Sequence, residues 1–356
     1  LIDKENNKID FKNYKIFILI QIIFYYFSVL FFYSKLSKSI DIKLSKIITI
    51  ILMINPFLTQ WHITMLTESI FLSLLIILLS FAINCKNNFN FFWIGLIIGI
   101  LYMQRTIAIL YPLVFLFFIF FNEGNAQKKI LNFSAIMFGF FIILILIGFH
   151  NLKRADIFYF TPMQSKTDLQ TYLEPNILSK SKNLSNLEAK IFIKKRSQKI
   201  LENNEFDLNK EKDKIIFFNI IRNKSLENIF ENKIVTVKIV LKNYFHSMLL
   251  NPVQVYYSTK YEKWIDFKNS KDHSFWFKIR IVITPIFFVL SAMGFFYSFK
   301  KLDLKLNLLI IISCLYFFGI SCWLGNTRYF TPSVLFMSIY FSIALNEFNL
   351  KLKKIN

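Results

Sequence analysis

The sequence predicts an all-α polytopic membrane protein with about nine membrane helical segments and a helical loop region outside the membrane. Composition is the first observation: 55% of the 356 residues are hydrophobic, and the mean hydropathy is +0.45. The second is the length of the apolar runs, several of which approach or exceed the ~20 residues that cross a bilayer as a helix. The third is that lysines concentrate in the short loops between these runs.

Nine apolar segments follow one another along the chain. They cover residues 15–33, 46–59, 64–84, 91–103, 106–121, 130–149, 275–298, 305–324 and 329–347. Asn55-Pro56 falls in the second segment, where proline removes a backbone donor and kinks or ends the helix. Only Gln104 and Arg105 separate the fourth segment from the fifth. These two segments therefore form either one long broken helix or two short helices joined by a tight turn.

The lysine distribution predicts the orientation. If the first segment starts outside, thirteen lysines lie in the cytoplasmic loops and tail, against Arg105 and Arg328 in the short outer loops. Cytoplasmic loops carry the excess of positive residues, and long loops translocate regardless of charge. The predicted organisation is therefore 1–149 with six segments, 150–274 as an extracytoplasmic helical region, and 275–356 with three segments and a basic cytoplasmic tail. The N-terminus is expected outside.

The long loop region is predicted to be helical and not a linker. Ser185 and Glu188 have the spacing of a capping box. Ala189, Ile193 and Ile200 then form part of an apolar stripe. Such helices either lie on the outer membrane surface or pack together as a small cap.

The net charge of +21 first raises the possibility of a nucleic-acid partner. Here the lysines flank membrane segments, so we expect membrane lipids as partners and no nucleic acid. Cys85, Cys314 and Cys322 form no CxxC pair, and the four histidines are scattered. A disulfide framework and a thiolate metal site are therefore not expected.

Glu68 is the first candidate functional residue, because an ionisable group inside a membrane segment is costly unless it is paired or hydrated. The alternative is an interfacial glutamate that reaches water or caps its helix. His62 and Thr67 lie beside it in the sequence and belong to the same candidate site. His62 and its neighbour Trp61 are alternatively ordinary residues of the membrane interface.

Arg105 and Arg328 are the next candidates, since both lie on the outer side with Glu68. Arginine binds phosphate in a bidentate manner, which suits a lipid-linked phosphate at headgroup level. Tyr329 follows Arg328 in "GNTRYFTP". The alternatives are an ion pair between Arg105 and Glu68, and an interfacial anchor at Arg328. Two loop acids, Asp156 and Asp168, are either acid–base residues or simply solvated.

Three stretches resemble the polytopic glycosyltransferases of the GT-C fold, in particular the bacterial dolichyl-phosphate-mannose–protein mannosyltransferase-like family. They are "INPFLTQWHITMLTESIFLSLLIILLSFAI", "WIGLIIGILYMQRTIAILYPLVFLF" and "NTRYFTPSVLFMSIYFSIAL". The first is similar in its proline-containing helix end followed by "TES", the second in its Arg between two helices, and the third in its opening Arg-Tyr. Thr106 stands where the family usually has proline after that Arg.

The resemblance implies transfer of a sugar from a polyprenyl-phosphate donor to a glycan, lipid or protein acceptor at the outer face of the bacterial inner membrane. It implies that Arg105, Arg328 and Tyr329 bind the donor phosphate. The family's acidic general base lies in the first outer loop, which is expected upstream of Leu1, so no catalytic residue is assigned. Some enzymes of this fold use a divalent metal and others do not, which leaves the cofactor unknown.

Two alternative functions follow from the same residues. One is a non-catalytic GT-C homologue. The other is a lipid-linked oligosaccharide flippase or transporter, for which polar residues would line a path near the midplane of the membrane.

Overall fold

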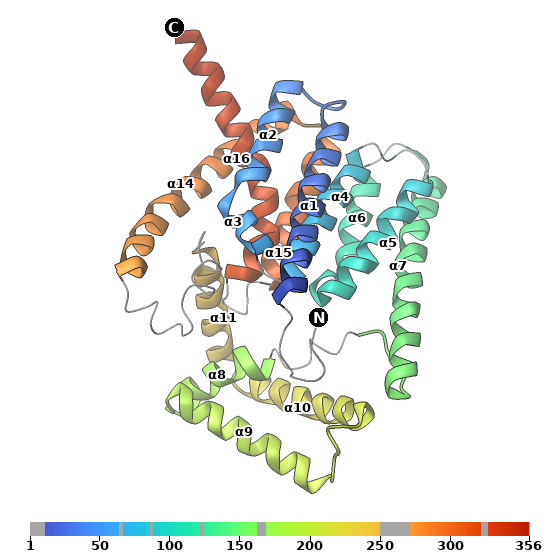
Figure 1. Ribbon diagram of the computed structural model, residues 1–356, viewed down its shortest axis with the longest axis vertical. Helices are drawn as coiled ribbons and strands as arrows, with labels where there is room; N and C mark the ends of the chain where they lie inside the picture. The colour runs from blue at the N-terminus through green and yellow to red at the C-terminus, as the bar shows by residue number, and fades with distance from the viewer. Residues whose placement is uncertain are drawn as a thin grey trace. The chain divides into compact units, whose positions relative to one another are not determined.

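The structure is a computed structural model that describes residues 11–63, 67–83, 85, 88–121, 124–161, 169–249, 271–321 and 327–355. These residues fold into helices and connecting turns without a β-strand (Figure 1), which confirms the all-α prediction. The chain divides into two compact units. Unit 1 comprises Leu1–Phe140, Met248–Ile320 and Thr327–Asn356, and unit 2 comprises Phe141–Ser247 and Ser321–Asn326.

Unit 1 contains the apolar helices. They are α1 (Phe11–Leu36), α2 (Ile42–Ile54), α3 (Pro56–Thr59), α4 (Thr67–Ile83), α5 (Asn88–Gln104), α6 (Tyr111–Phe120), the first half of α7 (Ala126–Ala155), α14 (Lys271–Lys301), α15 (Leu304–Ser321) and α16 (Thr327–Ile355), with 3₁₀ turns η1 (Gln60–Ile63) and η2 (Thr106–Ala108). Each of the nine predicted segments thus coincides with an apolar helix or helix pair.

Four helical stretches among the described residues are long and apolar enough to cross a membrane. They are Lys15–Leu36, Ala126–Ala155, Lys278–Lys301 and Arg328–Lys353. A fifth is added if α2 and Pro56–Ile63, bent by 44° at their junction, are taken as one broken span. Helix α4, helix α5, the η2–α6 pair and helix α15 are apolar but shorter. The structure is therefore compatible with a multi-pass membrane protein, and the number of nine spans stays a prediction.

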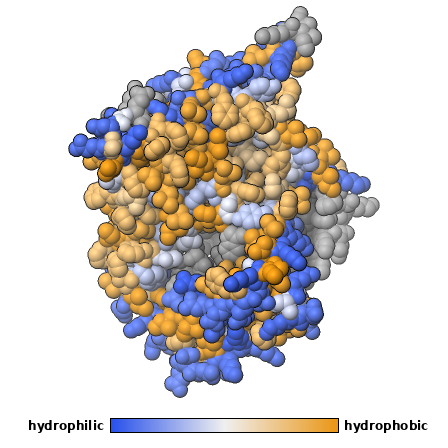
Figure 2. Space-filling view, turned by 180° about the vertical axis from the view of Figure 1, so that it is seen from behind, coloured by the Kyte–Doolittle hydropathy of each residue, from blue (hydrophilic) through white to orange (hydrophobic). Residues whose placement is uncertain are grey.

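The surface of the molecule carries large apolar areas. Hydrophobic residues cover much of the face seen in Figure 2. Helix α1 alone exposes Leu19, Ile23, Phe27 and Leu30, each by more than half of its area. Monomeric soluble proteins rarely expose continuous apolar patches of this kind, whereas lipid tails cover them at no cost.

Two interruptions of the apolar helices are set by polar residues. Asn55 ends α2 and begins α3: its Oδ1 accepts from the Phe57 N–H at 2.9 Å, and its Nδ2 donates to Ser338 Oγ at 2.8 Å. Arg105 is extended between α5 and η2, with φ −148° and ψ 120°. The fourth and fifth predicted segments are therefore two short helices and not one broken helix.

The length of helix α16 between two ion pairs can be compared with the thickness of a bilayer. Near its start, Arg328 contacts Glu68; near its end, Glu347 forms an ion pair with Lys301 of α14 at 2.8 Å. At 1.5 Å per residue, the stretch from Arg328 to Glu347 is about 28 Å long, close to the ~30 Å hydrocarbon core of a bilayer. Lys351 lies beyond the second contact, with its Nζ 3.2 Å from Tyr297 Oη. Arginines therefore lie at one end of this helix and lysines at the other.

Unit 2 is built from short polar helices. After the last part of α7 and a π turn, η4 (Leu169–Leu173), come α8 (Glu174–Ser181), α9 (Asn186–Asn203), α10 (Glu211–Glu231) and most of α11 (Lys233–Met248). The predicted capping box at α9 is confirmed: Ser185 Oγ accepts from the Glu188 N–H at 3.2 Å, and Glu188 Oε2 accepts from the Ser185 N–H at 2.8 Å. These hydrogen bonds lower the pKa of Glu188. Of the predicted stripe, Ala189 and Ile193 are buried beside Leu178.

The carboxylate of Glu174 joins three helices of unit 2 and is completely buried. Arg196 of α9 donates to both of its oxygens, at 2.6 and 2.9 Å. From α10, Ser225 Oγ donates to Oε2 at 2.6 Å and Asn228 Nδ2 donates to Oε1 at 2.5 Å. Because a buried charge is tolerated only when it is paired and hydrogen-bonded, this network fixes how α8, α9 and α10 pack.

We expect Glu174→Gln to destabilise unit 2 by about 2–4 kcal/mol, because it leaves the Arg196 charge uncompensated in a largely buried position. Hydrogen exchange of peptides from α8, α9 and α10 would measure the loss of protection. Glu227→Gln is the matched control, since the Glu227 side chain is 56% exposed and pairs with Lys224, which is itself 51% exposed. Surface pairs of this kind contribute about 0–1 kcal/mol. Equal protection in the two variants would contradict the role assigned to Glu174.

Gly294 permits the close approach of α14 to α16. A Cβ added at Gly294 would overlap the backbone carbonyl of Tyr340, whereas one added at Gly319 of α15 would meet nothing within 4 Å. We expect Gly294→Ala to destabilise the protein by about 1–3 kcal/mol, the usual cost of overpacking. Gly319→Ala should leave stability unchanged or raise it slightly, because alanine favours the helix. Melting temperatures in one detergent would compare them, and equal melting temperatures would contradict the close packing.

Candidate functional site

Two arginines converge on one carboxylate in unit 1. Glu68 lies in the first turn of α4 and is 1% exposed. Its Oε1 accepts from Arg105 Nη1 at 2.9 Å and also from Arg328 Nε. The three residues come from the start of α4, the break after α5 and the start of α16. The ion pair between Arg105 and Glu68, one of the two readings of Arg105 in the sequence, is therefore formed.

The two arginines have different surroundings. The Arg105 side chain is only 8% exposed, and its guanidinium lies 5.8 Å from the ring centre of Phe71 and 5.0 Å from that of Tyr329. Aromatic faces at such distances attract a cation. The Arg328 side chain is 35% exposed. Arg105 is thus fixed inside the cluster, and Arg328 is the arginine that an incoming ligand meets first.

The electrostatics of this arginine cluster (Glu68, Arg105 and Arg328) favour an anion. One carboxylate and two guanidiniums have a formal sum of +1. The first turns of α4 and α16, where Glu68 and Arg328 lie, add the positive ends of two helix dipoles. Glu68 itself offsets part of the dipole of α4. A phosphate at this place would be held by charge-assisted hydrogen bonds, which are about twice as strong as neutral ones.

His62 does not join the arginine cluster directly. It belongs to η1, its Nδ1 lies 2.6 Å from Ser69 Oγ, and its ring lies 4.0 Å from that of Tyr25. Ser69 follows Glu68 on α4, so the residue that contacts His62 is next in the chain to the residue that carries the carboxylate. Thr67 is the first residue of α4 and is partly exposed.

Trp61 and His62 are buried inside the protein. Both are 3% exposed. The Trp61 Nε1 donates to the Phe57 carbonyl at 3.1 Å, so the indole satisfies its only donor inside the protein. Packing against α1 and α3 therefore accounts for their burial, and their depth in a membrane stays a prediction.

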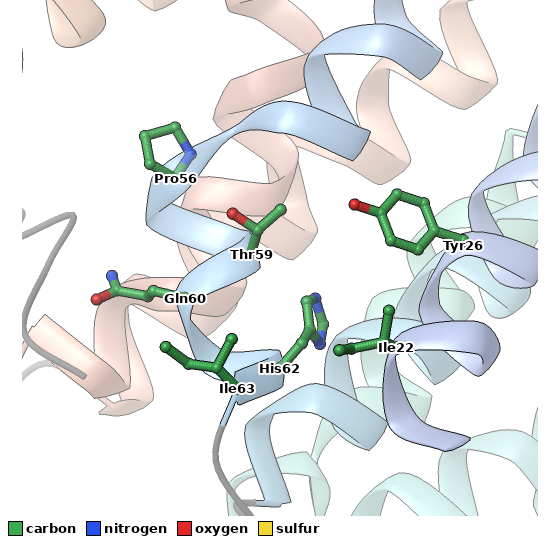
Figure 3. Close-up of a pocket in the computed structure, with 7 residues that line it drawn as sticks. All are labelled: Ile22, Tyr26, Pro56, Thr59, Gln60, His62 and Ile63. Atoms are coloured by element: carbon green, nitrogen blue, oxygen red, sulfur yellow. The ribbon is translucent and has the colours of Figure 1, made fainter. Parts of the chain in front are cut away.

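A pocket of about 320 Å³ lies beside His62, between α1 and the α3–η1 segment (Figure 3). Its polar lining consists of Tyr26, Thr59, Gln60 and His62, and its other lining residues are apolar. Figure 3 shows one nitrogen of the histidine ring directed toward the space between Thr59 and Tyr26.

Of the two remaining acidic candidates, the structure describes only Asp156, which belongs to unit 2, whereas the arginine cluster and His62 belong to unit 1. Asp156 is exposed directly after α7 in unit 2 and has a left-handed backbone, with φ 55°. Asp168 lies outside the described residues, as does the segment before residue 11. Within the described part of the chain, no group of three or more His, Cys, Asp and Glu side chains could hold a metal ion. The cofactor, left unknown by the sequence, therefore stays unassigned.

No family model, no curated protein and no solved structure matches the chain.

We expect Glu68→Gln to destabilise unit 1 by about 3–5 kcal/mol, because removing one partner of a buried ion pair leaves its arginines uncompensated. Thermal unfolding in detergent micelles would measure the change. Glu347→Gln is the control, since Glu347 also pairs with a basic residue across two helices, but its partner Lys301 is 34% exposed. That variant should lose less than about 1 kcal/mol. A smaller loss for Glu68→Gln than for Glu347→Gln would contradict the assigned pairing.

Proposed function

We propose that the protein is a membrane glycosyltransferase of the GT-C type, which transfers a sugar from a polyprenyl-phosphate donor at the outer face of the bacterial inner membrane. The observation that carries this proposal is the convergence of Arg105 and Arg328 on Glu68 at one end of the helix bundle. The resemblance of the surrounding stretches to that family supports it.

The depth of the arginine cluster fits a lipid-borne phosphate. Arg328 and Glu347 are separated along α16 by about the thickness of the hydrocarbon core, and lysines follow at the Glu347 end. By the positive-inside rule the lysine end is cytoplasmic. The arginine cluster is then level with the outer headgroups, which is where the phosphate of a polyprenyl carrier lies.

Each residue of the cluster has a defined part in this mechanism. Arg328, the more exposed arginine, binds the donor phosphate and stabilises the negative charge that develops on it as the sugar leaves. Arg105 supplies the second positive charge and is oriented by Glu68, Phe71 and Tyr329. Glu68 is a positioning residue. In the family that these stretches resemble, a carboxylate in the first outer loop removes the acceptor proton.

A second candidate function is favoured by the break between α2 and α3. Ser338, which binds Asn55 at this break, lies about 15 Å along α16 from Arg328, roughly half of the ~30 Å core. Transporters use helices that are interrupted near the midplane. Against this function, the polar groups of Asn55 are already bonded within the protein, to Phe57 and Ser338. A flippase for lipid-linked sugars is therefore the second candidate, after the transferase.

We expect Arg328→Gln to reduce sugar transfer about tenfold to 100-fold, because a hydrogen bond to a charged group contributes about 1.5–3 kcal/mol. Arg328→Lys should retain part of the activity, since it keeps the charge but loses the bidentate geometry. Transfer would be measured in membranes with a panel of radiolabelled polyprenyl-phosphate hexoses, together with binding of labelled polyprenyl phosphate.

The control for this experiment is Arg222→Gln, which removes an exposed arginine of α10 by the same substitution. It should transfer sugar at the wild-type rate. Wild-type transfer by Arg328→Gln would contradict the phosphate site. Translocation of a labelled polyprenyl-phosphate hexose across proteoliposomes, in the absence of any transfer, would favour the flippase. Binding without either activity would favour the non-catalytic homologue.

A further inference from the structure

The pocket beside His62 contains a buried polar atom that the protein itself does not satisfy. His62 is 3% exposed, and its Nδ1 is taken by Ser69 Oγ. Its Nε2 is buried without a hydrogen-bond partner among the residues that the structure describes. An unsatisfied buried group of this kind is costly, so it marks strain, a bound water or the place of a ligand.

The position of the ring points to a ligand. Nδ1 faces Ser69 on α4, so the nitrogen seen in Figure 3 between Thr59 and Tyr26 is the outer one, Nε2. The hydroxyls of Thr59 and Tyr26 both donate to backbone carbonyls, those of Asn55 at 3.1 Å and Met53 at 3.4 Å. Their oxygens still offer lone pairs to the pocket. Three polar atoms from α1, α3 and η1 thus converge on one space.

The chemistry of the lining selects a neutral, hydroxylated group. Among the described residues that line the pocket there is no acid, lysine or arginine, so they offer a charged head group no counter-charge. A hydroxyl both donates and accepts, and therefore satisfies Nε2 in either tautomer of His62. A second hydroxyl of the same head group can donate to the oxygen of Thr59 or Tyr26.

The surroundings of the pocket select a lipid. Tyr26 is 39% exposed and Ile63 is 42% exposed. Tyr26 belongs to α1, whose exposed apolar side chains, Ile23 and Phe27 among them, contact lipid tails in a membrane. Ile22 provides a further apolar wall. A ligand that enters from this side carries its hydroxyl into the pocket and leaves a hydrocarbon tail along α1.

We propose that the pocket binds the neutral hydroxylated head of a membrane amphiphile, with His62 Nε2 as its hydrogen-bond partner. His62 contacts Ser69 of α4, and Glu68 is the residue before Ser69 on the same helix. The pocket and the arginine cluster therefore lie at the same end of unit 1. Of the acceptor classes that remain open, the pocket therefore selects a lipid-borne hydroxyl as the sugar acceptor. That last assignment rests on the proposed function, whereas binding itself does not.

The test uses the whole chain in lipid nanodiscs and a photoreactive alkyl glucoside with a diazirine next to its head group. Irradiation should label peptides that contain residues 56–63 and the first half of α1, and unlabelled alkyl glucoside should compete. Two further probes identify the ligand chemistry. An alkyl phosphate of the same chain length should not label these peptides, and soluble methyl glucoside should not compete at the same concentration.

Substitutions then locate the contact. His62→Leu should reduce labelling about tenfold, which is the effect of losing one well-placed hydrogen bond of about 1.4 kcal/mol. His62→Gln, whose amide reaches a position near Nε2, should restore labelling to within about threefold of the wild type. Ile22→Trp, which fills the pocket from a partly exposed wall on α1 and keeps the His62 side chain, should reduce labelling as strongly as His62→Leu.

Several results would overturn the proposal. One is labelling spread evenly along α1, which indicates ordinary lipid contact, and another is equal labelling by the glucoside and the phosphate. Unchanged labelling in both His62→Leu and Ile22→Trp would also exclude the pocket. Equal competition by soluble methyl glucoside would exclude a lipid ligand. Labelling that follows all these expectations in a protein without sugar transfer would support the pocket and contradict only the proposed transferase.

Discussion

The structure of unit 1 depends on one buried carboxylate. A charge in an apolar bundle is tolerated only with a partner, and Glu68 takes two. To reach it, Arg105 must leave the helix, and an extended residue therefore separates α5 from η2. Arg328 must lie in the first turn of α16. The pairing thus fixes where three helices begin or end, and it brings these ends together at the same level of the bundle.

The same pairing gives the bundle two chemically different ends. A helix of fixed rise connects the arginine cluster with the Lys301–Glu347 pair, at a separation of about one hydrocarbon core. Between Arg328 and Glu347, α16 carries no charged residue. Lys301 and Lys351, two of the lysines that predict a cytoplasmic side from the sequence, therefore lie at the opposite end of α16 from Arg328. Which end faces the cytoplasm stays a prediction.

The hydrophobic pattern predicted where the helices lie, because burial in lipid or protein leaves a long apolar run in the sequence. The same pattern does not predict which charged residues pair, because Glu68 and Arg328 are 260 positions apart and no sequence pattern connects them. Charge sign and predicted side were enough to nominate both residues, although not to pair Arg328 with Glu68. Glu174 was missed because one more acid in a polar loop looks solvated, and only folding places Arg196 and Ser225 around it. The burial of His62 could not be predicted either, because the stacking of its ring on Tyr25 leaves no pattern in the sequence. Its part in the candidate site stays a prediction.

On the proposed function, the charge of the arginine cluster would also make it bind the donor and the product differently. On the proposed function the donor is a phosphodiester with one negative charge, which brings the formal sum of +1 to neutrality without displacing Glu68. Loss of the sugar leaves a phosphate monoester, whose second pKa near 6 gives it a charge of about −1.5 to −2 at neutral pH. The cluster with product then carries a net negative charge, and the buried carboxylate of Glu68 opposes the added charge more strongly than before. On the proposed function, Glu68 would therefore orient the arginines for the donor and, by the same charge, favour release of the polyprenyl phosphate once the sugar has left.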